Sequence, residues 1–143
     1  MKVVINKCYG GFSLSMEAQK AIAKLKNQTV YFYTTVYDHS GSTINRSFKR
    51  IDKDPDVGTI FCVAQDLGET CLDKDLNKAT HLGYDRDIDR SDPDLVKVVE
   101  KLGEKADGAY AKLKIIEIPD DITWEVHEYD GMERIEEMHQ SWG

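Results

Sequence analysis

The run from Thr29 to Tyr37 constrains the fold more than any other part of the chain, because all nine of its residues are β-branched or aromatic. Such residues favour the extended backbone of a strand. Side chains alternate between the two faces of a strand. Tyrosines would occupy one face and other apolar side chains the opposite face: Tyr31, Tyr33 and Tyr37 against Val30, Phe32 and Val36. A strand that is apolar on both faces is typical of a sheet interior, so we expect a central strand.

The remaining segments follow in an order that favours the α+β class. Further strands are predicted at 2–8, 44–51, 59–64, 111–118 and 122–129, and residues 65–90 are predicted to be a polar surface excursion. Helices are predicted between the first two strands, after residue 92 and after residue 130. Hairpins and helical crossovers are therefore mixed along the chain. We predict a single compact α+β domain over residues 1–143, with a mixed, largely antiparallel sheet and about three helices.

Three local patterns indicate where the helices begin. Ser13 or Ser15 precedes an apolar stripe, and a serine hydroxyl can accept a hydrogen bond from a free amide of the first helical turn. Pro93 follows Asp92 and suits the first helical position. The spacing of Asp130 and Glu133 is that of a capping box. It predicts a third helix that buries apolar side chains near the end of the chain: Met132, Ile135 and Trp142.

Composition places the chain among globular proteins, with 41% hydrophobic and 31% charged residues. No apolar run approaches the roughly 18 residues that span a bilayer, and the apolar start is too short for a secretion signal. Cys8, Cys62 and Cys71 show no C-x-x-C spacing and are expected to be free thiols in a reducing compartment. We expect a cytoplasmic protein. On strand 122–129, Trp124 is expected on the buried face.

The net charge of −7 is concentrated near the end of the chain. Residues 115–143 hold nine acidic residues and one basic residue, Arg134, and carry −8. Such a region repels phosphates, so direct nucleic-acid binding is not expected there. Three interpretations stay open: a solvated face, a surface for a basic partner, or a mimic of nucleic acid. The partner surface would use the glutamates of this region: Glu125, Glu128, Glu133, Glu136 and Glu137.

A pair of glycines joins the first strand to the first helix and suggests an anion site. Glycines allow close approach of a backbone, and the free amides of a helix start attract anions. The candidate ligand-binding residues here are Tyr9, Gly10, Gly11, Ser13 and Ser15. The segment is neither a Walker A loop nor G-x-G-x-x-G. The alternative is that the glycines only serve a tight turn.

A second group of candidates lies on the predicted central strand and its partner. Tyr31 and Tyr33 could stack on a base or sugar, while Arg46, Lys49 or Arg50 could pair with phosphate. The alternative is a buried or interfacial tyrosine stripe. Nanomolar capture of an anion needs about 12 kcal/mol, more than a helix start supplies. A high-affinity site therefore requires the glycine turn, the tyrosines and the arginines to converge on one cavity.

Catalytic and metal chemistry have weaker support in the sequence. Cys8, beside a predicted helix start, is a candidate nucleophile, with His39 as the loop histidine that could act as base. His39, His81, His127 and His139 are scattered and form no metal-binding pair. The stretch D-R-D-I-D-R-S-D-P-D lacks the central glycine and closing glutamate of a Ca²⁺ loop. We predict no metal site, no cofactor and no membrane partner.

Three segments carry a resemblance to a known family. They are K-V-V-I-N-K-C-Y-G-G-F-S-L-S at 2–15, I-D-R-S-D-P-D-L-V-K-V-V-E-K-L-G-E-K-A-D-G at 88–108, and I-P-D-D-I-T-W-E-V-H-E-Y-D-G-M-E-R-I-E-E-M-H-Q-S-W at 118–142. The chain resembles a family of small bacteriophage and prophage proteins that carry no assigned function. The middle, from about residue 29 to 85, does not take part in the likeness.

The resemblance implies a setting in an infected host cell, where small phage proteins often disarm host defences. The leading hypothesis is a non-enzymatic binding protein that counters host antiviral defence by sequestering a small nucleotide signal. One alternative is an acidic inhibitor, or nucleic-acid mimic, that blocks a host protein. Another is an enzyme that depends on Cys8. Partners would be a nucleotide-like anion, a host protein, or a second copy of the chain.

Overall fold

The computed structural model describes residues 1–38, 45–53, 59–84 and 87–138. Within these residues the chain forms helices and short strands in an α+β arrangement. The helices are α1 (Met16–Leu25), α2 (Asp73–Lys78) and α3 (Pro93–Leu102), and a 3₁₀ turn covers Gly103–Ala106. The strands are β1 (Lys2–Asn6), β2 (Tyr31–Asp38), β3 (Asn45–Ile51), β4 (Ile60–Val63), β5 (Thr70–Leu72), β6 (Leu113–Glu117), β7 (Trp124–Tyr129) and β8 (Met132–Glu137). The predicted α+β class is confirmed.

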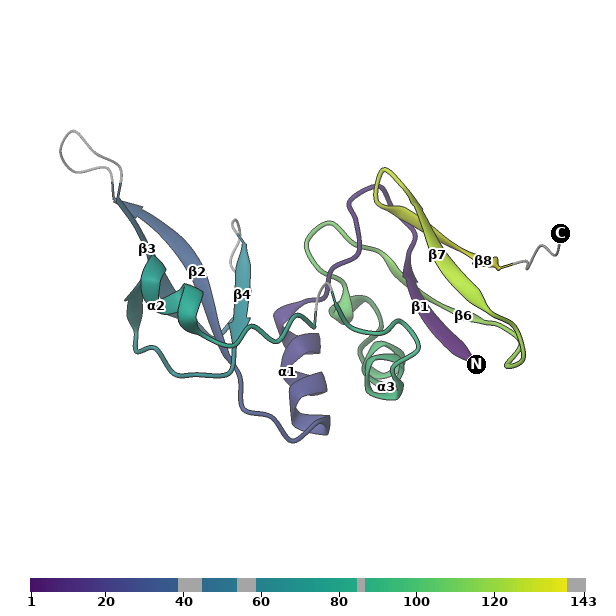
Figure 1. Cartoon of the computed structure of the whole chain (residues 1–143), viewed down its shortest axis with the longest axis horizontal. Coiled ribbons are helices and arrows are strands. Elements are labelled where there is room, and N and C mark those ends of the chain that lie inside the picture. The colour runs from purple at the N-terminus through teal and green to yellow at the C-terminus, as the bar shows by residue number, and fades with distance from the viewer. Residues whose placement is uncertain (39–44, 54–58, 85–86, 139–143) are drawn as a thin grey trace, which may run out of the picture.

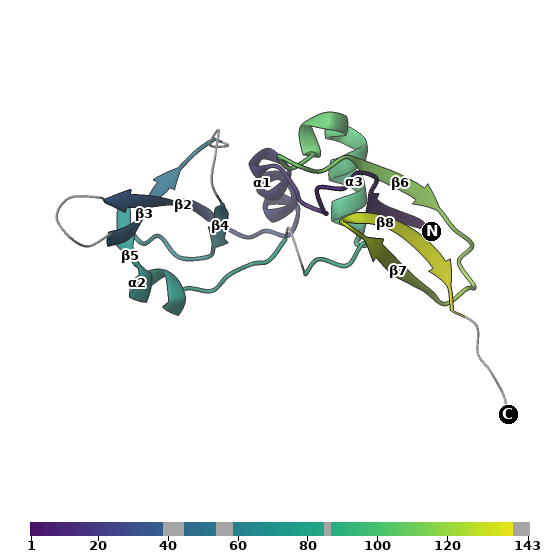
Figure 2. The ribbon, with the colours of Figure 1, turned by 90° about the horizontal axis from the view of Figure 1, so that it is seen from above.

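The strands form three small antiparallel sheets instead of one. Their orders are β4-β2-β3-β5, β1-β6 and β7-β8. Figure 1 shows the four-stranded sheet with α2 at one end of the molecule and the two small sheets at the other, with α1 between them and α3 beside β1. Figure 2, seen from above, shows the same separation of the four-stranded sheet from the two small sheets. One buried apolar cluster includes Val4 of β1, Ile22 of α1 and Phe32 of β2, so it reaches across this arrangement.

Strand β2 lies inside the four-stranded sheet, as its composition predicted. Phe32 and Tyr33 are fully buried, on opposite faces. Val36 and Tyr37 are exposed, because the partner strand β4 pairs with β2 only from Tyr31 to Thr34. The apolar run of β2 therefore extends beyond the part of the strand that pairs with β4.

Local capping explains where the two long helices begin. Ser15 is the N-cap of α1, and its hydroxyl accepts a hydrogen bond from the Ala18 amide at 3.1 Å. Asp92 caps α3, with Pro93 at the first position. Both starts agree with prediction. Helix α3 ends at Leu102 and continues as the 3₁₀ turn.

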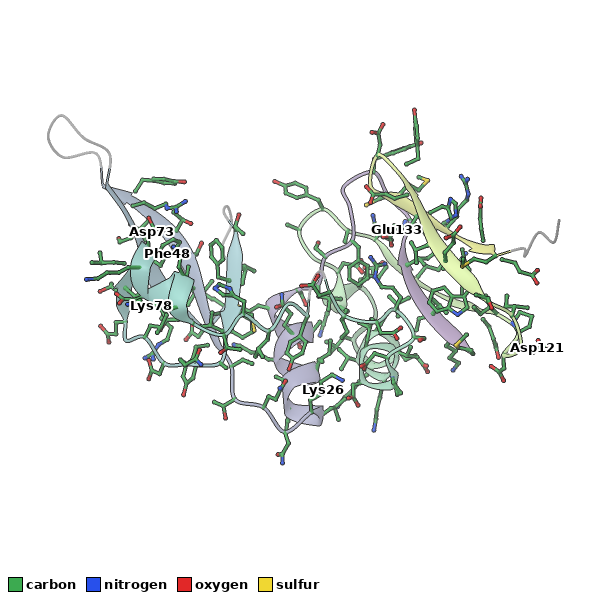
Figure 3. All side chains as sticks on the ribbon, in the orientation of Figure 1. Lys26, Phe48, Asp73, Lys78, Asp121 and Glu133 are labelled. Carbon is green, nitrogen blue, oxygen red and sulfur yellow. The ribbon has the colours of Figure 1, made fainter. Side chains whose placement is uncertain are left out.

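Lys26, just after α1, ties this helix to the start of α3. Its ammonium lies 2.8 Å from an Asp92 carboxylate oxygen and 3.1 Å from one of Asp94. The hydrogen bond that Lys26 donates to Asp92 is the main reason that the pKa of Lys26 is raised. Burial opposes the charged form of Asp92, but Lys26 and the amides of Leu95 and Asp94 outweigh it and lower the pKa of Asp92. Figure 3 labels Lys26 at this end of α1.

Replacing Lys26 with methionine should lower the free energy of unfolding by about 1 kcal/mol near neutral pH. A carboxylate with a lowered folded pKa stabilises the fold above its ordinary value of about 3.9, and that contribution is lost as the pH falls through the folded value. The gap between the wild type and Lys26→Met should therefore close on acidification. Urea unfolding of both proteins, from about pH 7 down to about pH 2.5, measures it. If the difference in unfolding free energy stayed constant with pH, the ion pair between Lys26 and Asp92 would not be its cause.

Residues 65–90 hold more structure than the predicted surface excursion. Strand β5 joins the edge of the four-stranded sheet by pairing with β3. Helix α2 follows directly and buries Leu76 in a second apolar cluster with Tyr33, Phe48 and Val63. A strand of three residues and a helix of six are too short to show a hydrophobic period.

The third predicted helix is wrong, because residues 132–137 form strand β8. Asp130 and Gly131, with φ values of 49° and 86°, make the tight turn of a β7–β8 hairpin. Two positive φ values are what an Asp-Gly hairpin turn requires. Met132 and Ile135 lie half-buried on this strand, and Trp142 falls outside the described residues. Trp124, expected to be buried, is half-buried, because β7 pairs with no described strand other than β8.

Candidate functional site

The predicted ligand-binding residues fall in two separate places. Tyr9, Gly10 and Gly11 follow β1, and Ser13 and Ser15 lead into α1. The other candidates lie on the four-stranded sheet: Tyr31 and Tyr33 on β2, Arg46 and Arg50 on β3. Strand β1 and the four-stranded sheet lie on opposite sides of α1 (Figure 1). The structure therefore does not bring the glycine turn, the tyrosines and the arginines to one cavity.

Three chain segments meet beyond the end of β1, and we call this place the loop junction. It comprises residues 7–13, 107–112 and 128–133. Asn6, fully buried, connects all three. Its side-chain amide donates to the carbonyls of Cys8 and Gly131, both at 2.7 Å, and its side-chain oxygen accepts from the Lys112 amide at 2.8 Å. A buried polar side chain with every partner satisfied fixes the relative positions of the segments.

A buried ion pair between Arg90 and Glu133 supports the loop junction. Glu133 of β8 is 5% exposed and accepts two hydrogen bonds from the Arg90 guanidinium, at 2.5 and 2.9 Å. Glu133 also accepts a hydrogen bond from the backbone amide of Asn6 at 2.8 Å. Arg90 lies over the ring of Phe12, 3.5 Å from the ring centroid. Figure 3 labels Glu133 on β8, which contacts β1. Glu133 therefore belongs to the interior and not to the predicted acidic partner surface.

Glycines at the loop junction allow backbones to touch. A Cβ on Gly10 would lie 1.8 Å from the Tyr110 carbonyl oxygen, and one on Gly131 would lie 2.4 Å from the Gly11 nitrogen. A Cβ on Gly108 would lie 2.0 Å from the Ser13 hydroxyl. Side chains are excluded at these three positions, so the glycines have a packing role.

The helix start beside the glycine turn already has partners within the protein. The Ser15 hydroxyl donates to the Lys105 carbonyl at 2.6 Å while it caps α1, and the residue is buried. The Ser15 amide donates to the Ala106 carbonyl at 2.9 Å. A cavity of ≈ 550 Å³ does open at the glycine turn, but its charged side chains are acidic. Its lining comprises Tyr9, Gly10, Gly11, Glu128, Asp130 and Gly131. These carboxylates favour a cation over the predicted anion.

Three tyrosines stand exposed on the loop junction, one from each segment. Tyr9, Tyr110 and Tyr129 are 66%, 76% and 71% exposed. The three segments that carry these tyrosines are adjacent, because Gly10 packs on the Tyr110 backbone and Gly131 packs on the Tyr9 carbonyl. Phenol faces attract cations, and carboxylates pair with ammonium or guanidinium groups. The arrangement can therefore bind a basic group through rings and carboxylates together.

The candidates on the four-stranded sheet are mostly engaged with their own neighbours. The buried Tyr33 hydroxyl donates to the Gly68 carbonyl at 2.8 Å and accepts from the Leu67 amide at 2.9 Å. Burial raises the pKa of Tyr33. Arg46 pairs with Asp73 at 2.6 Å. Tyr33 and Arg46 thus have structural partners.

Tyr31 and Arg50 are the two sheet candidates that share a cavity. They line a groove of ≈ 660 Å³ at the β2–β3 ends nearest α1. Arg50 also pairs with Asp66 at 2.7 Å. The groove lies apart from the loop junction, and the two cavities have no lining residue in common.

Within residues 1–38, 45–53, 59–84 and 87–138, Cys8 has no catalytic base among its hydrogen-bond partners. The Cys8 thiol donates to the Tyr110 carbonyl at 2.9 Å and lies 3.4 Å from the Asn6 side-chain oxygen, neither of which is a base. His39, the proposed partner of Cys8, falls outside the described residues. Cys62 and Cys71 are buried, and burial raises the pKa of Cys71. Among the residues that the structure describes, no group of three or more metal-ligating side chains occurs, and no helix is long and apolar enough to cross a membrane.

Sequence reasoning located the glycine turn but missed the residues that surround it. Asn6, Arg90, Tyr110 and Glu133 come from four distant parts of the chain, so no local spacing links them. The Asp-Gly pair at 130–131 was the one available signal, since it predicts a hairpin. Comparison of the chain with protein-family models, with curated proteins and with solved structures finds no match.

Proposed function

We propose that this is a non-enzymatic binding protein whose loop junction recognises a basic surface on a partner protein. The observation that carries the proposal is the exposure of Tyr9, Tyr110 and Tyr129 on the three segments of the loop junction, where Tyr9 lines a cavity together with Glu128 and Asp130. Tyrosine is enriched in protein interfaces and among the residues that dominate binding energy. Each tyrosine offers a large apolar ring with a polar hydroxyl, a combination suited to contact with a partner.

Charge supports the choice of partner. The region 115–143 carries −8, and it contributes the hairpin that forms one side of the loop junction. Exposed carboxylates on this hairpin include Glu125, Glu128 and Asp130. A field of this sign steers a basic partner toward the tyrosines and suppresses binding to nucleic acid.

Rigidity supports high affinity. The three segments are fixed by Asn6, by the Arg90–Glu133 pair and by glycines in close backbone contact. A preorganised binding surface loses little conformational entropy when it binds, so more of the contact energy appears as affinity. The resemblance to small phage proteins implies an infected host cell as the setting for such binding. There, the proposed role is to block a host defence protein.

The predicted capture of a nucleotide at the glycine turn receives no support from this geometry. The cavity there is lined with carboxylates, and Arg46 and Arg50 lie on another sheet. Thiol catalysis by Cys8 receives none either, because its described hydrogen-bond partners are a carbonyl and an amide oxygen. Protein binding through tyrosines and carboxylates is the function that the site supports best.

The proposal is tested with a fluorescein-labelled peptide rich in lysine and arginine, followed by fluorescence anisotropy. The wild-type protein should bind it, and should bind a glutamate-rich peptide of the same length far more weakly. Tyr129→Ala should weaken binding about tenfold or more, as expected of an interface tyrosine. The matched control is Tyr37→Ala, an exposed tyrosine on β2 away from the loop junction. Equal affinities for the two variants would refute the assigned surface.

A further inference from the structure

A groove between α3 and the start of β1 is a second concave surface at this end of the molecule, and we call it the α3 groove. Its volume is ≈ 590 Å³. The helix contributes residues at the spacing of a single helical face, and the strand contributes its first residue. The lining includes Lys2 of β1 and Pro93, Val96, Lys97, Glu100 and Lys101 of α3.

The charge of the α3 groove is opposite to that of the loop junction. Lys2, Lys97 and Lys101 supply cations, and Glu100 is the carboxylate among the lining residues. Glu100 pairs with Lys2 at 3.1 Å. Lys97 and Lys101 are exposed and form no ion pair with any residue that the structure describes. Their ammonium groups therefore remain able to pair with carboxylates on another molecule.

Apolar surface in the α3 groove suits aromatic side chains. Pro93 is exposed at the start of the helix, next to the buried Val96 one turn further along. Lysine side chains add apolar stems that end in cations, and the faces of tyrosine rings attract such cations. The loop junction presents exposed tyrosines together with carboxylates, so each kind of group on one surface has a counterpart on the other.

The two surfaces lie at opposite ends of β1. Lys2, the first residue of the strand, lines the α3 groove, whereas Asn6, the last, joins the segments of the loop junction. In Figure 1 the chain start lies at the first of these ends, and the turn between β7 and β8 lies at the other. The two surfaces are therefore held apart within one molecule, but they can meet between two copies.

We infer that the protein associates with itself head to tail, so that the loop junction of one copy occupies the α3 groove of the next. The inference rests on the proposed function, since both use the loop junction as the binding surface. Lys97 and Lys101 would pair with the carboxylates of the loop junction, and tyrosine rings would lie on Pro93.

The head-to-tail arrangement has two consequences. Because the two contacting surfaces differ, every added copy leaves one surface of each kind free, and the assembly continues as a ring or an open chain. A basic partner and the α3 groove would also compete for the same loop junction. Self-association would therefore regulate how much of the loop junction is open to a partner.

Analytical ultracentrifugation of the full chain tests the inference at concentrations from about 5 to 500 μM. The average mass of the wild type should rise with concentration above that of one chain. Lys97→Glu/Lys101→Glu should lower the association constant at least about tenfold, because like charges then face each other. The matched control is Lys74→Glu/Lys78→Glu, which makes the same change at exposed positions of equal spacing on α2. The inference is overturned if the wild type stays a single chain throughout, or if both double variants associate equally.

Mixing two variants tests which surfaces meet. Tyr9→Ala/Tyr129→Ala alters only the loop junction, and Lys97→Glu/Lys101→Glu alters only the α3 groove, so each should stay a single chain by itself. All four side chains are exposed, so both variants should fold. An equimolar mixture should form a complex of two chains and nothing larger, because only one unaltered loop junction and one unaltered α3 groove can meet. A mixture that forms no complex would overturn the head-to-tail arrangement.

Binding of the lysine- and arginine-rich peptide separates this inference from the proposed function. Lys97→Glu/Lys101→Glu keeps the loop junction, so it should bind the peptide at least as tightly as the wild type. The peptide should also lower the average mass of the wild type, since it competes with the α3 groove. If this variant failed to bind the peptide, the proposed function would be refuted. If the peptide bound to a wild type that stays a single chain, only the self-association would be refuted.

Discussion

Replacing Arg90 with methionine is expected to destabilise the fold by about 3–5 kcal/mol, the range for a buried ion pair that loses one partner. The variant leaves the Glu133 carboxylate, 5% exposed, without its two guanidinium hydrogen bonds. It also removes the cation from the face of Phe12. Urea unfolding followed by circular dichroism measures the change in free energy.

The control for this variant is Arg134→Met. Arg134 lies on the same strand as Glu133 but is 64% exposed, and it pairs with Glu136 at the surface. Exposed pairs contribute at most about 1 kcal/mol, so Arg134→Met should change stability little. The double variant Arg90→Met/Glu133→Leu should recover part of the loss, because no unpaired buried charge remains. If Arg90→Met cost no more than Arg134→Met, the pair would not support the loop junction.

Gly131→Ala is expected to cost about 2–5 kcal/mol, since two separate penalties fall on one position. The backbone at Gly131 has φ of 86°, which costs a residue with a side chain about 1–2 kcal/mol. The new Cβ would also lie 2.4 Å from the Gly11 nitrogen and 2.7 Å from the Tyr9 carbonyl oxygen. Displacing packed backbone of this kind adds about 1–3 kcal/mol. Thermal or urea unfolding gives the total.

Gly68→Ala separates the two penalties. Gly68 has φ of 89°, but the nearest atom to an added Cβ would be the Thr70 carbonyl oxygen, at 3.7 Å. Only the backbone penalty applies there, so Gly68→Ala should cost about 1–2 kcal/mol. Basic-peptide binding should weaken in Gly131→Ala and persist in Gly68→Ala, because only the first displaces Tyr9. Equal stability losses in the two variants would show that the backbone contact is not tight.

Sequence patterns correctly predicted the features of the fold that depend on residues close together in the chain. The β-branched run at 29–37 predicted a central strand, and Ser15 and Pro93 marked the helix starts correctly. The error at 130–137 arose because an Asp-x-x-Glu spacing fits a helix cap, whereas Asp-Gly fits a hairpin turn. The hairpin signal was the stronger of the two, since only the hairpin needs positive φ at both residues.

The candidate site was predicted in part, and the reason is physical. Tyr9, Gly10 and Gly11 do line a cavity, but its charge is set by Glu128 and Asp130, more than 100 residues away in the chain. No spacing rule reveals that contact. Arg46 is paired with Asp73, an acid in a segment predicted to be a polar surface excursion. Where partners are distant in sequence, a residue type alone does not fix the chemistry of a site.

The pairing of β1 with β6 has a consequence for how the protein is made. Val3 is opposite Ile116, so the first strand acquires its partner only after more than 100 further residues have been synthesised. At about 5–20 residues per second, Val3, Val4 and Ile5 wait several seconds or more on the ribosome without the strand that covers their edge. Such long-range pairing also slows folding in general. During synthesis these three apolar residues therefore appear long before the strand that pairs with them, although in the finished protein they are fully buried.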